Sequence, residues 1–214
     1  MTTRFSEKDR TKRVISLLKK NYSNPHTALN YDSPFQLLVA TILSAQCTDK
    51  RVNLVTPSLF KKYRTPYEFA SVDPEALAND INSINFFRNK AKSIVNCARQ
   101  LVERHGGMVP KSMKELTDLS GVGRKTANCV LGGAFGIAEG IVVDTHVLRL
   151  ANRLGFSKSQ DPEKVEKDLM ETFPKKGWID LSNLFILHGR STCKAINPKC
   201  PECILKEICP SANI

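Results

Sequence analysis

The chain has 214 residues, and its 32 lysines and arginines outnumber its 21 aspartates and glutamates, which gives a formal net charge of +11. A basic excess of this size favours a polyanionic partner, most often nucleic acid. No apolar run approaches the roughly 20 residues of a membrane span, and no apolar signal core follows the charged N-terminus. We therefore expect a protein of the cytoplasm or nucleoid with no membrane partner.

The order of apolar and helix-capping residues predicts an all-α fold, with length enough for one domain or two small ones. Only Ile141 to Val143 suggests a strand. The predicted helices lie, in chain order, around Val14–Leu18 up to Asn24-Pro25, from Ser33-Pro34, from Asp73-Pro74, over Lys90–Glu103 up to His105-Gly106-Gly107, after the Ser112–Glu115 capping box, over Val147–Leu150, and from Asp161-Pro162 to Met170.

In the segment Leu119-Ser120-Gly121-Val122-Gly123-Arg124-Lys125-Thr126-Ala127, the capped helix runs into a short hairpin and a further predicted helix starts at once. Two glycines in a tight turn let backbone amides converge beside a helix N-terminus, an arrangement that binds a phosphate without reading bases. Many helical hairpins use glycine simply to turn. In a basic chain, however, this segment is typical of a helix–hairpin–helix that binds the DNA backbone.

Lys125 lies in the first turn of the helix after this hairpin, where the helix dipole disfavours a positive charge. Partial desolvation would lower its pKa further, and a lysine with a lowered pKa acts as an amine nucleophile that forms a Schiff base. On local grounds alone, an ordinary solvated lysine is the more common case.

Asp144 directly follows three β-branched residues and directly precedes a predicted helix. We expect it to be a helix N-cap that stays ionised, which also suits an electrostatic catalyst. His146 has no partner histidine nearby in the sequence, so we expect a structural or phosphate contact rather than a metal ligand.

Four cysteines near the C-terminus follow the spacing Cys193-x6-Cys200-x2-Cys203-x5-Cys209. Four thiolates held close together suit an iron–sulfur cluster or zinc. Two disulfides are the alternative, but disulfides are rare in reducing compartments. A zinc ribbon usually has two separated C-x2-C pairs, and only one is present here. We expect a lobe whose folding depends on the metal group.

These motifs together resemble the endonuclease III family of DNA glycosylase/AP lyases, over roughly Ser33 to Cys209. The resemblance implies a six-helix barrel at residues 27–137 and a cluster domain at 1–26 and 138–214, with the active site in the cleft between them. It rests on SPFQLLVATILSAQCTD, LSGVGRKTAN, VVDTHVLRLANR, ILHGRSTC and the cysteine segment.

The resemblance also implies the roles of individual residues. Lys125 would be the nucleophile and Asp144 the essential carboxylate, and Gln46 would fill the gap left by a flipped base. Phe86 would be the wedge in the base stack, and the hairpin, with His146, would contact the DNA backbone. The implied ligands of a 4Fe–4S cluster are Cys193, Cys200, Cys203 and Cys209, and the implied hairpin contacts are Gly121, Val122 and Gly123.

The implied enzyme is a monomer that removes oxidised pyrimidines from duplex DNA and cleaves 3′ to the abasic site by β-elimination. One alternative is a monofunctional mismatch or adenine glycosylase, which lacks the lysine. The other is a non-catalytic iron–sulfur DNA-binding protein, which does not need the Lys125–Asp144 pair. This chain also departs from the family pattern: Ser120 stands where the family has proline, and Ile84-Asn85-Phe86-Phe87 stands where the family commonly has Ile-Gly-Leu-Tyr.

Overall fold

The computed structural model describes residues 6–212, apart from the side chains of Glu7 and Lys8. Within this range all regular structure is helical, with eleven α-helices and two short 3₁₀ turns, so the predicted all-α class is confirmed. Residues 141–143, where the sequence suggests a strand, form an extended segment that pairs with no other strand of the described chain. No helix of the described chain is long and apolar enough to cross a membrane.

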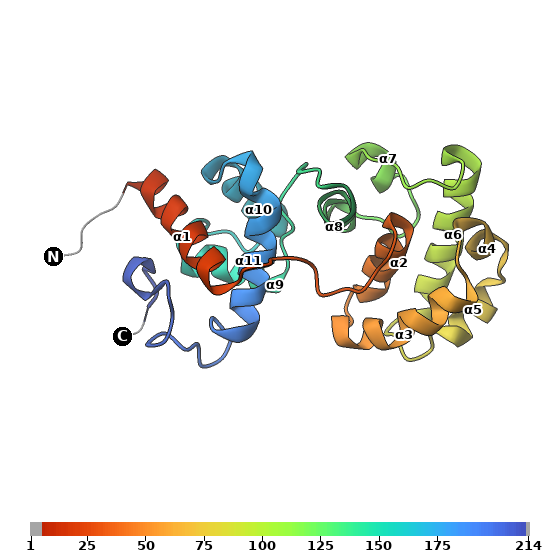
Figure 1. The fold of residues 1–214 in the computed structure, drawn as a ribbon, viewed down its shortest axis with the longest axis horizontal. Coiled ribbons are helices and arrows are strands. Elements are labelled where there is room, and N and C mark those ends of the chain that lie inside the picture. The colour runs from red at the N-terminus through yellow and green to blue at the C-terminus, as the bar shows by residue number, and fades with distance from the viewer. Residues whose placement is uncertain (1–5, 213–214) are drawn as a thin grey trace. The chain divides into compact units, whose positions relative to one another are not determined.

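The chain divides into two compact units, each described here by itself. One unit is Ala28–Glu139, and the other runs to Thr27 and resumes at Gly140. The helices of the first unit, coloured orange to green in Figure 1, are α2 (Pro34–Ser44), α3 (Asp49–Lys62), α4 (Pro66–Ser71), α5 (Pro74–Asp80), α6 (Phe87–His105), α7 (Met113–Thr117) and α8 (Arg124–Phe135). Those of the second are α1 (Glu7–Asn21), α9 (Thr145–Arg153), α10 (Pro162–Thr172) and α11 (Trp178–Ser191), with the turns η1 (Lys175–Gly177) and η2 (Lys206–Ile208).

Helix α2 is the central helix of the first unit, as its apolar sequence predicts. Eight of its eleven residues are buried, and it packs against α3, α6 and α8. Ser33 caps it by accepting a hydrogen bond from the backbone of Gln36 at 3.2 Å. The contact with α8 is close: a Cβ added at Gly133 would lie 2.8 Å from Leu37 Cδ2. Glycine inside α8 is therefore explained by a neighbouring helix.

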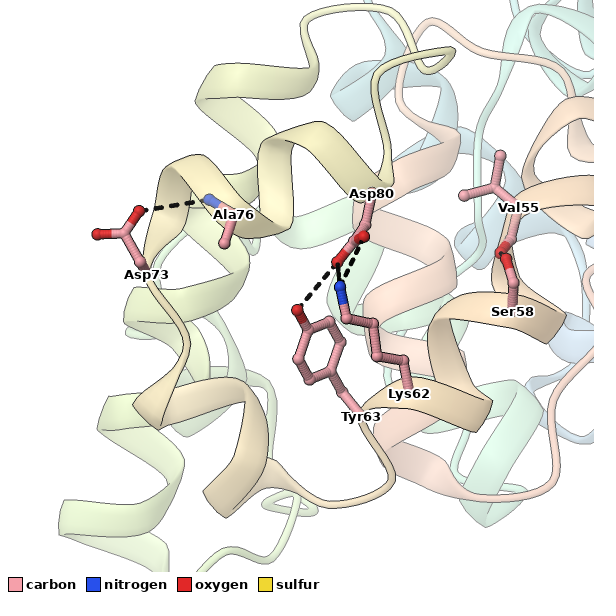
Figure 2. A network of polar contacts seen from close by, with 7 residues as sticks. All are labelled: Val55, Ser58, Lys62, Tyr63, Asp73, Ala76 and Asp80. Atoms are coloured by element: carbon pink, nitrogen blue, oxygen red, sulfur yellow. Dashed lines mark hydrogen bonds and ion pairs between the residues drawn. The ribbon is translucent and has the colours of Figure 1, made fainter.

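Helix α6 forms the other support of this unit and packs against α4 and α5 (Figure 1). It begins at Phe87, three residues before the predicted start, and ends at His105, where the C-cap Gly106 has a φ of 58° and gives the left-handed turn expected of glycine there. Asp80, at the end of α5, accepts hydrogen bonds from Lys62 Nζ at 2.8 Å and from the Tyr63 hydroxyl at 2.9 Å (Figure 2). These bonds hold the ends of α3 and α5 together just before the loop that leads into α6.

The second unit packs α11 against α1 and α9, and α10 against α1 and α9. Three phenylalanines form consecutive edge-to-face contacts in its core: Phe156 with Phe173, and Phe173 with Phe185. The backbone of Val142 donates to the Ser182 hydroxyl of α11 at 2.9 Å, which fixes the segment before Asp144. The unit thus holds α9 and α11 side by side.

Candidate active site and metal-binding segment

The hairpin between α7 and α8 is built as its sequence predicts. Gly121 has a φ of 76°, and a Cβ at this position would lie 2.8 Å from Ser93 Cβ of α6, so both backbone and space require glycine. Gly123 is the N-cap of α8. Gly121 and Gly123 are exposed, while Val122 is buried and anchors the turn to the core. The backbone amides at the start of α8 are thus presented at the surface, as an anion site requires.

Lys125 is exposed in the first turn of α8, and its neighbours Ala127 and Asn128 are buried. The helix is therefore anchored by one face while the Lys125 side chain faces solvent. The partial desolvation predicted for this lysine is not present in the described chain. Lys125 belongs to the first unit and Asp144 to the second.

Asp144 is the N-cap of α9, as predicted. Its Oδ1 accepts hydrogen bonds from the backbone amides of His146 at 2.8 Å and Val147 at 2.9 Å. Two amide donors at a helix N-terminus fix the orientation of the carboxylate. Both capping bonds use Oδ1 of Asp144, so the cap orients the carboxylate through one of its two oxygens.

His146 is half-buried and packs against Gly189 of α11, where an added Cβ would lie 2.9 Å from His146 Cβ. Its Nδ1 lies 3.1 Å from Arg149 Nη2, and the same guanidinium donates to the carbonyls of Gly189 and Cys193, each at 3.0 Å. His146 therefore has structural contacts within the second unit, consistent with one of the two expected roles.

The four spaced cysteines line a single cavity of about 210 Å³, together with Arg153, Lys199 and Lys206. Burial, followed by the proximity of the other cysteines, raises the pKa of the Cys203 and Cys209 thiols. No group of three or more His, Cys, Asp or Glu side chains among residues 6–212 is arranged to hold a single metal ion. The thiols therefore surround a space rather than converge on one point.

Nitrogen atoms of three residues lie within 3.4 Å of these sulfurs, and those of Arg153 and Leu205 donate hydrogen bonds to them. Arg153 Nη1 lies 3.3 Å from Cys193 Sγ, and His188 Nε2 lies 3.3 Å from Cys203 Sγ. The backbone amide of Leu205 donates to Cys203 Sγ at 3.4 Å. Burial lowers the pKa of His188 to about 4, so its imidazole is neutral at pH 7. Donors of this kind orient sulfur ligands and stabilise negative charge on them.

Gln46 and Phe86 lie in neighbouring loops of the first unit, after α2 and before α6. Both have left-handed backbones, with φ of 53° and 57°, and both side chains are exposed. Phe86 is 62% exposed and is one of several large apolar side chains at the surface of the described chain. Asparagine tolerates a left-handed backbone better than most residues, so Asn85 in place of glycine suggests a left-handed backbone at residue 85. In the structure the left-handed residue is Phe86, one position later.

Comparison with known proteins agrees with these features. The family model of the HhH-GPD superfamily base excision DNA repair proteins matches residues 39–175. Endonuclease III of Synechocystis sp. is 50% identical over 208 residues, covering 97% of this chain and 95% of the relative. The Escherichia coli K12 enzyme is 41% identical over 196 residues, covering 92% of each.

The chain belongs to the endonuclease III family of the HhH-GPD superfamily. It is accordingly a base excision DNA repair enzyme, a DNA glycosylase with AP lyase activity, and the predicted family is confirmed. A solved structure of a trapped endonuclease III–DNA covalent intermediate matches with a TM-score of 0.90 and 43% identity over 97% of this chain and 98% of that one. A thermostable thymine-DNA glycosylase, with a TM-score of 0.82 and 23% identity, shares the fold.

Several residues that organise the site were not predicted from the sequence. The whole of α11, which carries His188, was missed because its apolar residues surround the helix and give little periodicity. Arg149 and Arg153 were within a quoted motif, but their partners lie some forty residues away along the chain. The spacing of three and four residues between His146, Arg149 and Arg153 was the available signal, since it places them along one side of α9.

Proposed function

We propose that the chain excises oxidised pyrimidines from duplex DNA with Lys125 as nucleophile and Asp144 as the supporting carboxylate. The observation that carries this proposal is Lys125 itself, exposed in the first turn after an exposed glycine hairpin. The hairpin would hold a phosphate through its backbone amides, and that contact would bring the sugar of a flipped nucleotide to the lysine. Lys125 and Asp144 would then act on the same sugar.

The chemistry follows from the amine. Lys125 Nζ attacks C1′ of the sugar, and as the new C–N bond forms the glycosidic bond breaks and the base leaves with its electron pair. Opening of the sugar ring gives a Schiff base, which acidifies the C2′ proton. Loss of that proton expels the 3′ phosphate and cleaves the strand 3′ to the lesion. Water then releases the lysine.

Asp144 would stabilise the positive charge that develops on the sugar, or accept the proton that Lys125 loses. Its capping bonds through Oδ1 hold the carboxylate in place for either role. Gln46 would occupy the gap left in the duplex, Phe86 would wedge into the base stack, and His146 would contact the backbone. Damaged pyrimidines stack poorly, which lowers the few kcal/mol that flipping costs.

The cysteine cavity fits a 4Fe–4S cluster. Cys193, Cys200, Cys203 and Cys209 would hold the cluster through their thiolates, the ligands that iron–sulfur clusters use. The basic side chains of the cavity and the donors aimed at Cys193 and Cys203 would balance the negative charge of thiolate ligation. When bound, the cluster would supply a rigid cross-link that orders residues 193–209. Exposed Lys194 and Lys199 on this segment would then face DNA phosphates.

Borohydride trapping on DNA with an abasic site tests the proposed function. Wild-type protein should become covalently joined to the DNA, because borohydride reduces the Schiff base to a stable amine. Lys125→Gln should abolish trapping and strand cleavage while duplex binding changes little, since one charge among many is lost. Lys114→Gln, an exposed lysine of α7, is the matched control and should trap like wild type. Cleavage by Lys125→Gln at a near wild-type rate would show that the nucleophile is another residue.

We further infer that the protein acts as a monomer on DNA in the cytoplasm, at the nucleoid. The net charge of +11 supports a DNA partner, as do the solved endonuclease III–DNA complexes that it resembles. A panel of duplexes with different oxidised pyrimidines and opposite bases would establish the damage range. Sedimentation with and without duplex would establish the oligomeric state.

A further inference from the structure

Two strained loop positions lie in the first unit, at Gln46 and Phe86. A left-handed backbone is uncommon outside glycine, and an aromatic residue rarely adopts it. Such positions persist only where the surroundings fix them. Gln46 follows the end of α2, and Phe86 is the N-cap residue of α6, with its carbonyl accepting from the Lys90 amide at 3.1 Å.

A direct hydrogen bond joins the two loops. Asn85 Nδ2 donates to the backbone carbonyl of Gln46 at 2.7 Å. Asn85 is exposed, so no packing demand explains an amide at this position. The two residues are 39 positions apart in the sequence. Gln46 is itself one of the strained positions, and Asn85 directly precedes the other, Phe86. Asn85 therefore makes the conformations of the two loops depend on each other.

A buried lysine fixes the base of both loops. Lys90 is only 7% exposed, and its Nζ donates to the carbonyls of Leu43 at 2.8 Å and Ala45 at 2.6 Å. These carbonyls lie at the C-terminal end of α2, where no further helical amides are available and the helix dipole is negative. The first turn of α6 thus caps the last turn of α2, one residue before Gln46.

We propose that Asn85 is a positioning residue that couples the Gln46 loop to the Phe86 loop, so that both side chains enter the base stack of a damaged duplex as one preorganised unit. The proposal rests on the proposed function, which places Gln46 and Phe86 against DNA. Loops that are already ordered lose less conformational freedom on binding, and an exposed apolar wedge is suited to insertion between bases. Asn85 acts on the DNA through Gln46 and Phe86 and is not assigned a contact of its own.

Binding to a duplex with a tetrahydrofuran abasic analogue, which cannot be cleaved, tests the proposal. Asn85→Ala removes the donor, and Asn85→Asp keeps the shape but replaces the donor with an acceptor. We expect each variant to lose roughly tenfold of its preference for the tetrahydrofuran duplex over an undamaged duplex, equivalent to about 1.4 kcal/mol. Because the readout is a ratio of two affinities at one salt concentration, a change that weakens binding to both duplexes by the same factor cancels. Asn79→Ala, an exposed asparagine of α5, should keep the wild-type ratio.

A double-mutant cycle with Phe86→Ala separates coupling from a general loss of stability. If Asn85 positions the wedge, Asn85→Ala should change the ratio less than about threefold once Phe86 is gone, because contacting residues are non-additive. Fluorescence of 2-aminopurine opposite the analogue should also report weaker insertion for Asn85→Ala. Thermal melting should be nearly unchanged, as expected for an exposed side chain.

Three outcomes would overturn the proposal. If Asn85→Ala keeps the wild-type ratio, the hydrogen bond has no role in recognition, while the proposed function stands on Lys125 trapping. If the effects of Asn85→Ala and Phe86→Ala are fully additive, Asn85 does not act through the wedge. If wild-type protein shows no preference for the tetrahydrofuran duplex, the assigned DNA contacts of Gln46 and Phe86 fail and the proposal fails with them.

Discussion

The backbone amide of Ser120 donates a hydrogen bond to Gln100 Oε1 at 2.7 Å, linking the hairpin to α6. The family pattern has proline at this position, and proline has no amide hydrogen to donate. The other end of the Gln100 amide, Nε2, lies 3.5 Å from the Asp118 carbonyl, a much weaker contact. A side chain of α6 therefore restrains the hairpin at Ser120.

This relationship predicts strong coupling between the two residues. Gln100→Ala in the natural chain should lower the free energy of unfolding by about 1 kcal/mol, because a half-buried amide loses its partner. The same change in a Ser120→Pro background should cost almost nothing, since the donor is already absent. Urea unfolding of the four proteins gives the cycle. Equal costs in both backgrounds would mean that Gln100 stabilises the protein through other contacts.

Cys97 of α6 gives a pH-dependent prediction. It is 2% exposed, and burial raises the pKa of its thiol to about 12. Below the ordinary thiol value of 9.0, both folded and unfolded states keep the proton and stability does not depend on this group. Above it, the unfolded state loses the proton that the folded state retains, so the group lowers stability as the pH rises, until the pH reaches the folded value.

The measurement compares wild type with Cys97→Ala. Between pH 8 and pH 10.5 the wild-type free energy of unfolding should fall by about 2 kcal/mol more than that of the variant, at 1.36 kcal/mol per pKa unit. The other titrating groups are shared and cancel in the difference. The native thiol should also resist iodoacetamide at pH 8 while unfolded protein is labelled. Parallel pH curves for the two proteins would show that Cys97 is accessible in the folded state.

Sequence alone predicted the starts of five capped helices, because these starts depend on local capping chemistry. Ser33, Asp73, Ser112, Asp144 and Asp161 all accept hydrogen bonds from the first turn of the helix that follows. The sequence did not predict α3, which contains Pro57 in its interior. It also did not predict the capping box of Thr65 and Glu68 that begins α4.

The sequence did not predict the contacts that support the candidate site, and the reason is different. Lys90 reads as a surface lysine of an amphipathic helix, and only the approach of α2 makes it buried. Asn85 and Gln100 likewise acquire their roles from partners 39 and 20 residues away along the chain. The chemistry-bearing residues were recognisable by type and motif, whereas the residues that position them depend on tertiary contacts.

The cysteine cavity predicts a visible cofactor. Protein purified without oxygen should be yellow-brown and contain about four iron atoms per chain, as thiolate ligation of a 4Fe–4S cluster requires. Cys200→Ser should lose most of the colour and iron and lower the melting temperature, because cluster binding is coupled to folding of this segment. Its DNA binding should also depend less steeply on salt, by roughly 0.9 in the log–log slope for each phosphate that the variant no longer neutralises.

Cys47→Ser is the matched control for this change, since Cys47 lies in the other unit and should leave the iron content unaltered. Metal analysis that finds one zinc and no iron in wild-type protein would exclude the cluster. The assignment of Lys125 and Asp144 would then stand on their own tests.

Asp144 offers a test in which stability and catalysis separate. Asp144→Asn keeps a side chain that caps α9 about as well as aspartate, so the free energy of unfolding should fall by less than about 1 kcal/mol, the contribution of the charge at the helix N-terminus. Base excision should nevertheless fall by about a hundredfold or more, because a charge aimed at the developing cation is lost. Single-turnover excision and thermal melting measure the two effects.

Asp161 is the natural control because it caps α10 of the same unit in the same way, accepting from the Glu163 amide at 3.0 Å. Asp161→Asn should show the same small loss of stability and keep wild-type excision. A severe loss of both stability and excision in Asp144→Asn alone would mean that the carboxylate chiefly holds α9 in place. Loss of excision without loss of stability, seen only at Asp144, is the result that a catalytic carboxylate requires.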